Sequence, residues 1–265
     1  MLKFPPERII CLTEETVETL YLLGEEKRIV GVTGYAIRPK RVRKEKPRVG
    51  SFVSGKINKI RDLNPELILT FSDVQADLTK QLILEGFNVI CFNQQSISEI
   101  FSMIKYLGCL VGKTSEANKL VKKIKFKINL IKSEKETPRP KIYFEEWDDP
   151  HISATRWVSE IVEIAGGQDI FSAKSRQHKA LKRAISSDEV IIKNPDIIFA
   201  SWCGKKVNFQ KIKERAGWDT ISAIRTNSLF EIKSPIILQP GPAALTEGLL
   251  QIHGLIKDWR NRTAT

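Results

Sequence analysis

The sequence predicts an α/β protein built from two similar lobes joined by one long helix. Two stretches carry this prediction because they nearly repeat each other: Asn64-Pro65-Glu66-Leu67-Ile68-Leu69 and Asn194-Pro195-Asp196-Ile197-Ile198-Phe199. In both, the proline ends a helical segment and the acidic residue leads into a strand too apolar to face water. The third observation is the run 115–135, which has no Gly or Pro and mixes apolar and basic residues at helical spacing.

The first half of the chain alternates short apolar strands with helices, which predicts βαβ crossovers and a parallel sheet. Thr13 is the expected N-cap of the first helix and Gly24 its stop signal. The expected elements are strand 8–12, helix 14–23, strand 28–32, helix 56–63, strand 66–71, helix 75–85, strand 88–92 and helix 97–110.

The second half follows the long helix and repeats the pattern. The expected elements are strand 141–146, helix 156–165, helix 186–193, strand 196–202, helix 208–215, strand 229–232 and helix 243–259. We therefore expect two Rossmann-like lobes with parallel-rich central sheets, at residues 1–112 and 138–265, with a connecting backbone helix over 113–137.

Composition restricts the function. The net charge of +12 comes largely from 38–48 and 119–135, but neither run matches a nucleic-acid module, so we expect no nucleic-acid partner. No segment is apolar enough to span a membrane, and the N-terminus shows no signal peptide. As written, the chain is expected in the cytoplasm; a trimmed signal would instead make it periplasmic or lipid-anchored.

Four cysteines stand far apart with no metal-type spacing: Cys11, Cys91, Cys109 and Cys203. We interpret them as buried free thiols of a reducing compartment. No Gly-rich phosphate loop or hydrolase motif is present, so the sequence indicates no catalytic residue and no cofactor of the protein's own.

Several motifs together suggest a family. They are Val30-Gly-Val-Thr-Gly-Tyr35, Arg48-Val-Gly-Ser-Phe52, the two Asn-Pro units, Lys141-Ile-Tyr-Phe-Glu-Glu-Trp-Asp-Asp-Pro150, and the Gly-Gly-Gln-Asp-Ile-Phe171 ending. With these motifs the chain resembles the helical-backbone (class III) substrate-binding proteins of ABC importers, and among them the cobalamin (vitamin B12)-binding family. The resemblance implies a non-enzymatic monomer that binds a corrinoid in a shallow cleft between the lobes. Siderophore or haem binding in the same fold is an alternative.

A planar ligand of that size needs flat apolar walls and a few polar groups. Three aromatic residues are candidate walls because they stand near the ends of expected strands, where such sheets bind ligands: Tyr35, Trp147 and Trp202. The resemblance adds Phe52, because it stands where the cobalamin-binding family places an aromatic residue against the corrin. Gln239, in the Gln-Pro-Gly-Pro turn before the last helix, is the candidate hydrogen-bonding residue of the rim.

An acidic cluster ends the first strand of the second lobe. It consists of Glu145, Glu146, Asp148, Asp149 and His151. Alternation along a strand points Glu145 and Glu146 to opposite faces, which disfavours a shared metal site, so we expect no metal. Glu145 and Asp148 are candidates for orienting polar ligand groups, and the cluster could also cap a helix starting near Ser153. A cytoplasmic enzyme that uses this cluster is the remaining alternative.

The resemblance also implies a partner. In the family, one acidic residue on each lobe docks into the membrane permease. The matching positions in this chain are Asn58 and Asp188, six residues before each Asn-Pro pair. An ABC importer permease is therefore a possible partner.

Overall fold

The computed structural model describes residues 4–134 and 137–263 and forms two compact units. The first unit runs to residue 94 and includes 98–124; the second contains 95–97 and the chain from 125 onward. The first unit holds a sheet of parallel strands in the order β3-β2-β1-β4-β5. The second holds β10-β9-β6-β7, with β8 also pairing β6, and only β7 runs antiparallel to its neighbour within this sheet. The predicted parallel-rich α/β class is confirmed.

The predicted elements of the first unit are present within one or two residues of their expected ends. The unit contains β1 (Ile9–Cys11), α1 (Glu14–Leu22), η1 (Glu26–Arg28), β2 (Ile29–Thr33), α2 (Val42–Glu45), β3 (Arg48–Gly50), α3 (Ile57–Asp62), β4 (Leu67–Phe71), η2 (Asp73–Gln75), α4 (Ala76–Leu84), β5 (Val89–Phe92) and α5 (Ile97–Leu110). Of these, the short elements η1, α2, β3 and η2 were not predicted.

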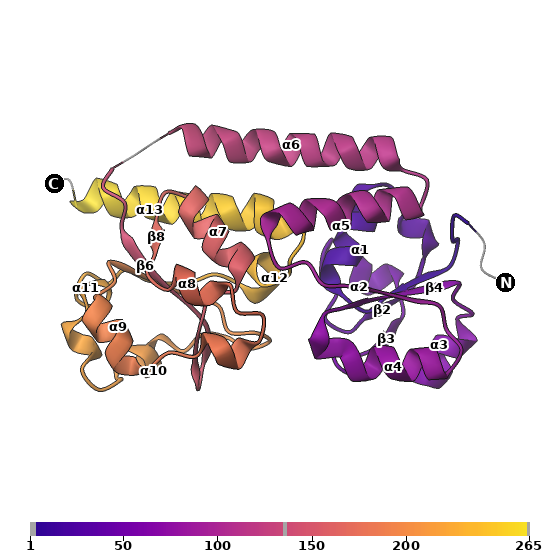
Figure 1. Cartoon of the computed structure of the whole chain (residues 1–265), viewed down its shortest axis with the longest axis horizontal. Helices are drawn as coiled ribbons and strands as arrows, with labels where there is room; N and C mark the ends of the chain where they lie inside the picture. The colour runs from indigo at the N-terminus through magenta and orange to yellow at the C-terminus, as the bar shows by residue number, and fades with distance from the viewer. Residues whose placement is uncertain (1–3, 135–136, 264–265) are drawn as a thin grey trace. The chain divides into compact units, whose positions relative to one another are not determined.

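The long helix α6 (Thr114–Ser133) is uninterrupted, as Figure 1 shows in magenta, and it buries Val121, Ile124 and Ile128 while its lysines face solvent. Its predicted end, residue 135, lies outside the described residues. Within the described residues, no helix combines the length and the apolar character needed to cross a bilayer.

The second unit contains the following elements: β6 (Lys141–Asp148), β7 (His151–Ser153), α7 (Arg156–Ile164), β8 (Gln168–Asp169), α8 (Ser172–Ser175), η3 (Ala180–Arg183), α9 (Ser187–Lys193), β9 (Ile197–Ala200), α10 (Phe209–Lys213), η4 (Trp218–Thr220), α11 (Ser222–Arg225), β10 (Leu229–Glu231), α12 (Ser234–Ile237), η5 (Ala244–Gly248) and α13 (Leu249–Thr263).

The internal duplication extends to backbone conformation. Asn64 and Asn194 both adopt φ 43°, a left-handed conformation that asparagine tolerates better than most residues. Each ends a helix, α3 or α9, and the proline that follows prevents the helix from continuing. The repeated Asn-Pro pair is therefore a helix stop in both units.

The acidic residue after each Asn-Pro pair serves the same purpose in both units. The Glu66 carboxylate accepts the backbone N–H of Glu7 at 2.6 Å, immediately before β1. The Asp196 carboxylate accepts the backbone N–H of Lys141 at 2.7 Å, at the start of β6. Each carboxylate thus ties the first strand of its sheet to the strand that pairs with it, which explains why both copies keep an acid here.

Thr13 is confirmed as the N-cap residue of α1 but makes no side-chain cap, and the predicted helix start near Ser153 is wrong. Thr13 occupies the N-cap position of α1, but its hydroxyl bonds the Thr16 hydroxyl at 2.8 Å instead of a helix amide. The helix expected to start near Ser153 begins at Arg156 with Thr155 as N-cap, because residues 151–153 pair with β6 as strand β7.

The cysteine prediction holds for one residue in four. Cys11 is a buried free thiol in the centre of its sheet, whereas Cys91, Cys109 and Cys203 are free and exposed. Apolar neighbours in the sequence suggested burial for these residues. Cys91, however, lies in β5, which is an edge strand, and Cys109 lies on the exposed face of α5.

Candidate ligand-binding site

In the first unit, the predicted aromatic residues Tyr35 and Phe52 follow the carboxyl ends of the paired strands β2 and β3. Thr33 and Gly50 are paired across β2 and β3, and the Gly34 amide continues the ladder to the Gly50 carbonyl at 2.7 Å. Tyr35 and Phe52 stand two residues beyond these partners, at the carboxyl ends of neighbouring strands. Tyr35 is 49% exposed and Phe52 is half-buried. The edge thus offers two accessible aromatic residues that follow the ends of neighbouring strands.

A buried glutamine fixes the backbone behind Phe52. The Gln75 side chain donates to the Phe52 carbonyl at 2.5 Å and to the Leu12 carbonyl at 3.0 Å. Its own oxygen accepts the Phe71 amide at 2.9 Å. Gln75 is fully buried and therefore ties the ends of β1, β3 and β4 together beneath the loop that carries Phe52. Sequence reasoning missed it, because nothing local marks a glutamine as buried.

Two buried glutamates follow β1 at the same edge of this sheet. Burial, assisted by repulsion from Glu15 and Glu18, raises the pKa of Glu14 to about 8. Burial also raises the pKa of Glu15 to about 7, against the opposing effect of the α1 amide and the Thr13 side chain. Among the described residues, no hydrogen bond reaches Oε2 of Glu14, so this carboxyl group is expected to hold a proton at neutral pH.

These raised pKa values predict that stability depends on pH. The folded protein binds protons more tightly than the unfolded chain at Glu14 and Glu15, so stability is fully present below about pH 4.5 and is lost as pH rises through about 7 to 8. Glu15→Gln removes the charge without removing volume. We expect it to raise the free energy of unfolding by about 2 kcal/mol at pH 8.5 and by far less at pH 5.

Urea unfolding of the wild type and Glu15→Gln at both pH values measures this difference. Glu116→Gln, an exposed position in the first turn of α6, is the matched control and should change neither value appreciably. An equal effect of Glu15→Gln at pH 5 and pH 8.5 would contradict the raised pKa.

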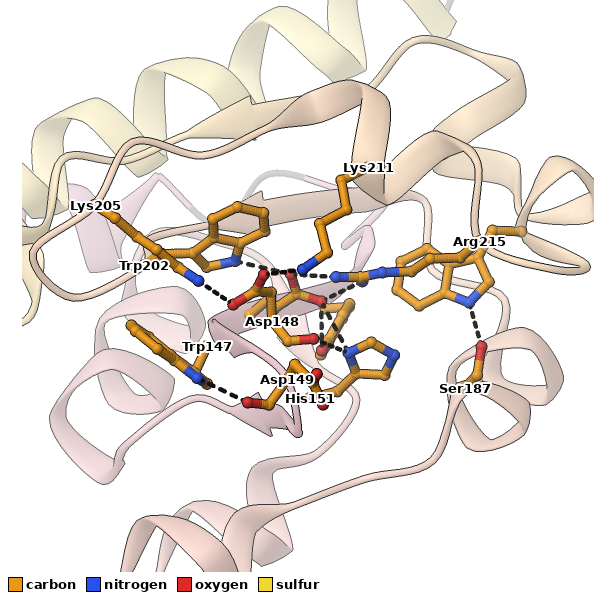
Figure 2. A network of polar contacts seen from close by, with 12 residues as sticks. Trp147, Asp148, Asp149, His151, Ser187, Trp202, Lys205, Lys211 and Arg215 are labelled. Atoms are coloured by element: carbon orange, nitrogen blue, oxygen red, sulfur yellow. Dashed lines mark hydrogen bonds and ion pairs between the residues drawn. The ribbon is translucent and has the colours of Figure 1, made fainter.

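In the second unit, strand β6 ends in a buried network around Glu145 (Figure 2). Arg215 Nη1 lies 2.5 Å from Glu145 Oε2, and its Nη2 lies 3.0 Å from Oε1. The Trp202 indole N–H donates to the same carboxylate at 2.9 Å, and the Tyr143 hydroxyl donates at 3.0 Å. Glu145 and Trp202 are both buried, so the predicted ligand contacts of these two residues stay predictions.

Asp148 holds a second ion cluster beside the first. Lys205 Nζ lies 2.5 Å from its Oδ1 and Lys211 Nζ lies 2.6 Å from its Oδ2. Desolvation acts to raise the pKa of Asp148, but the hydrogen bonds from Lys205 and Lys211 outweigh it and hold this pKa below its usual value. Asp148 is therefore a carboxylate with two cationic partners.

Trp147 and Trp202 flank one of these lysines. Lys205 Nζ stands 4.1 Å from the Trp147 ring centroid and 4.9 Å from that of Trp202. The Trp147 indole also donates to the Asp149 carbonyl at 2.9 Å. The second unit therefore brings together four predicted site residues, Trp147, Trp202, Glu145 and Asp148, with cations that the sequence did not single out.

Glu146 points away from Glu145, as strand alternation predicts. Its carboxylate binds Arg183, with both oxygens 2.8 Å from Nη2. His151 lies 4.0 Å from Glu145, and burial together with Arg215 lowers its pKa, so its ring is neutral at pH 7. Across residues 4–134 and 137–263, no group of three His, Cys, Asp or Glu side chains is placed to hold a metal ion.

The three remaining predicted residues lie elsewhere in their units. Gln239 is half-buried in the turn between α12 and η5, where its carbonyl accepts the Gly241 amide at 2.8 Å. Asn58 and Asp188 are exposed near the amino ends of α3 and α9, at matching positions of the duplicated units.

Comparisons with known proteins place the chain in a family. The periplasmic binding protein family matches residues 9–236, and the chain belongs to it. An uncharacterized ABC transporter substrate-binding lipoprotein of Bacillus subtilis, YvrC, is 28% identical over 260 residues, covering 95% of this chain and 80% of that protein. A vitamin B12-binding protein of Vibrio campbellii is 23% identical over 201 residues, covering 74% and 71% respectively.

Solved structures share the fold. The periplasmic vitamin B12-binding protein BtuF of Vibrio cholerae aligns with TM-score 0.76 at 22% identity, over 97% of this chain and 99% of that one. Staphylococcus aureus IsdE, solved with haem, aligns with TM-score 0.80 at 21% identity, over 96% and 99%. The predicted resemblance to class III substrate-binding proteins is confirmed.

Proposed function

We propose that this protein is a non-enzymatic binding protein for a planar tetrapyrrole-sized ligand, cobalamin or another corrinoid before others, which it delivers to an ABC importer. The observation that carries the proposal is the pair Tyr35 and Phe52, two accessible aromatic residues at one level of a sheet edge. Aromatic faces are the surfaces that a flat macrocycle needs. Relatives named vitamin B12-binding proteins support the choice of a corrinoid.

Haem is the second candidate, and a specific observation favours it. Lys205 and Lys211 place two cations on Asp148, and Lys205 also lies over the Trp147 ring. A porphyrin carries carboxylates that such cations would bind. A solved relative of this fold contains haem. Siderophores remain a third class in the same fold.

The proposal of a binding protein over an enzyme rests on how the acidic cluster is engaged. A general acid or base needs a carboxyl group free to exchange a proton with substrate. Glu145 is bound by Arg215, Glu146 by Arg183, and Asp148 by two lysines. Each of these three carboxylates would have to break an ion pair before it could exchange a proton with a substrate.

Delivery to a permease would use the exposed amino ends of α3 and α9. Asp188 offers a carboxylate there, whereas Asn58 is flanked by the exposed cations Lys56 and Lys59. We therefore propose that a permease partner presents a basic pocket to α9 and an acidic or neutral surface to α3. Such a role puts the protein on the outer side of the membrane, as the lipoprotein name of the Bacillus relative also suggests.

Substitution of the aromatic pair tests the binding proposal. Tyr35→Ala and Phe52→Ala should each weaken binding of the preferred tetrapyrrole about tenfold, because each removes a stacked ring and its buried area. All five tryptophans lie outside the two substitutions, so quenching of their fluorescence remains a usable signal. Tyr106→Ala, a 65% exposed tyrosine on α5, is the control and should bind like the wild type. Unchanged affinity in both Tyr35→Ala and Phe52→Ala would refute the assignment.

A further inference from the structure

Backbone hydrogen bonds fix the positions of both lysines in the ion cluster of Asp148, Lys205 and Lys211. Lys205 lies in a turn in which its amide bonds the Trp202 carbonyl at 3.3 Å, and Gly204 makes this turn possible with φ +75°. Lys211 lies in the first turn of α10, where its amide bonds the Asn208 side chain at 3.1 Å. Both lysine backbones are therefore fixed, and Asp148 draws their ammonium groups together (Figure 2).

The cluster carries one more positive charge than negative. The Asp148 side chain is only 2% exposed, whereas Lys205 and Lys211 are 41% and 53% exposed, so the two ammonium groups lie on the solvent side of the carboxylate. Each ammonium has three N–H donors, and one is directed at Asp148. The remaining donors and the excess charge face outward.

Neighbouring charges do not cancel this excess. Glu145 and Arg215 neutralise each other at 2.5 Å, and His151 is neutral at pH 7. Among the described residues, the Asp149 carboxylate forms no ion pair with Lys205 or Lys211. Within residues 4–134 and 137–263, Lys205 and Lys211 therefore share the single carboxylate of Asp148 and have no second anionic partner.

We propose that Lys205 and Lys211 form a subsite for an oxyanion on the rim of the ligand, either a carboxylate or a phosphate. This proposal rests on the proposed function and narrows its substrate class: the favoured ligands are planar macrocycles that bear such a group. Asp148 is then a positioning residue, which aligns the two ammonium groups without touching the ligand. Trp147 and Trp202 hold Lys205 in place through their ring faces.

Two pairs of ligands test the subsite in the wild-type protein. Iron protoporphyrin IX carries two carboxylates, which its dimethyl ester replaces with two uncharged methyl esters. Cobalamin and cobinamide differ in that cobalamin retains the phosphate-linked nucleotide. We expect the ligand that carries the carboxylates or the phosphate to bind about tenfold more tightly than the other member of its pair. This preference should shrink as the salt concentration rises.

Variants test whether Lys205 and Lys211 cause this ligand preference. Lys205→Gln/Lys211→Gln should abolish it, and Lys205→Arg/Lys211→Arg should restore it. Because the first variant leaves Asp148 buried without a cation, Asp148→Asn/Lys205→Gln/Lys211→Gln is the version that keeps the fold, checked by its melting temperature. Lys179→Gln/Lys213→Gln loses the same number of charges at exposed positions of the same unit and should keep the preference.

The outcomes separate the two proposals. If one ligand pair binds with equal affinity for both members, or if the preference survives in the triple variant, the oxyanion subsite is wrong and the proposed function stands. If none of the four ligands binds, the proposed function and the subsite fall together.

Discussion

Arg215→Leu is expected to lower the free energy of unfolding by about 3–5 kcal/mol, the largest loss that we predict for one substitution. Glu145 is fully buried and takes both of its closest cationic contacts from this guanidinium. Without Arg215 the carboxylate remains in the core, and among the described residues its side-chain hydrogen bonds then come from the neutral donors Tyr143 and Trp202. Urea unfolding followed by circular dichroism measures the loss.

Two further variants show whether the ion pair is the cause. Glu145→Leu/Arg215→Leu removes both charges and should recover a large part of the lost stability, because no buried charge is left without a partner. Arg225→Leu removes an exposed arginine from α11 and should stay within about 0.5 kcal/mol of the wild type. A double variant as unstable as Arg215→Leu would show that packing, and not the unpaired charge, explains the loss.

Gln75→Leu is expected to lower the free energy of unfolding by about 3 kcal/mol and also to weaken ligand binding. The substitution keeps an apolar body of similar length but leaves the Leu12 and Phe52 carbonyls and the Phe71 amide without their buried partner. Because one of these groups belongs to Phe52, the loop that carries this aromatic wall loses its anchor. Stability and tetrapyrrole affinity should therefore fall together in the same variant.

The matched control is Gln81→Leu, at an exposed position on α4, which should change neither quantity appreciably. A Gln75→Leu protein that is destabilised but binds with wild-type affinity would show that Phe52 does not depend on Gln75. In that case the proposed role of Phe52 would rest on its exposure alone.

The fold followed from the sequence because its main signals are local. The Asn-Pro pairs stop helices through the conformation of Asn64 and Asn194, and the apolar runs after them are buried strands. Short elements such as β3 and β7 were missed, since each has three residues and owes its conformation to a neighbouring strand. The pattern of apolar residues cannot reveal pairing of that kind.

The candidate site was only partly predictable for a physical reason. Tyr35 follows a strand that the sequence predicts, whereas Phe52 follows β3, which was missed, and was chosen by the family resemblance alone. The partner of Glu145, however, is 70 residues away in sequence, and Lys211 is 63 residues from Asp148. An arginine or lysine in a helix gives no local sign that it will bind a buried carboxylate, so these cations emerged only with the tertiary structure.

Titration of the wild-type protein with cobalamin, cobinamide and haem, followed by tryptophan quenching and by absorbance, tests the central claim most directly. The account predicts saturable one-to-one binding of at least one of these macrocycles at about micromolar affinity or tighter, with the ligand spectrum showing no chemical conversion. Failure of all three to bind, or steady conversion of a bound ligand, would contradict a binding protein for planar tetrapyrroles.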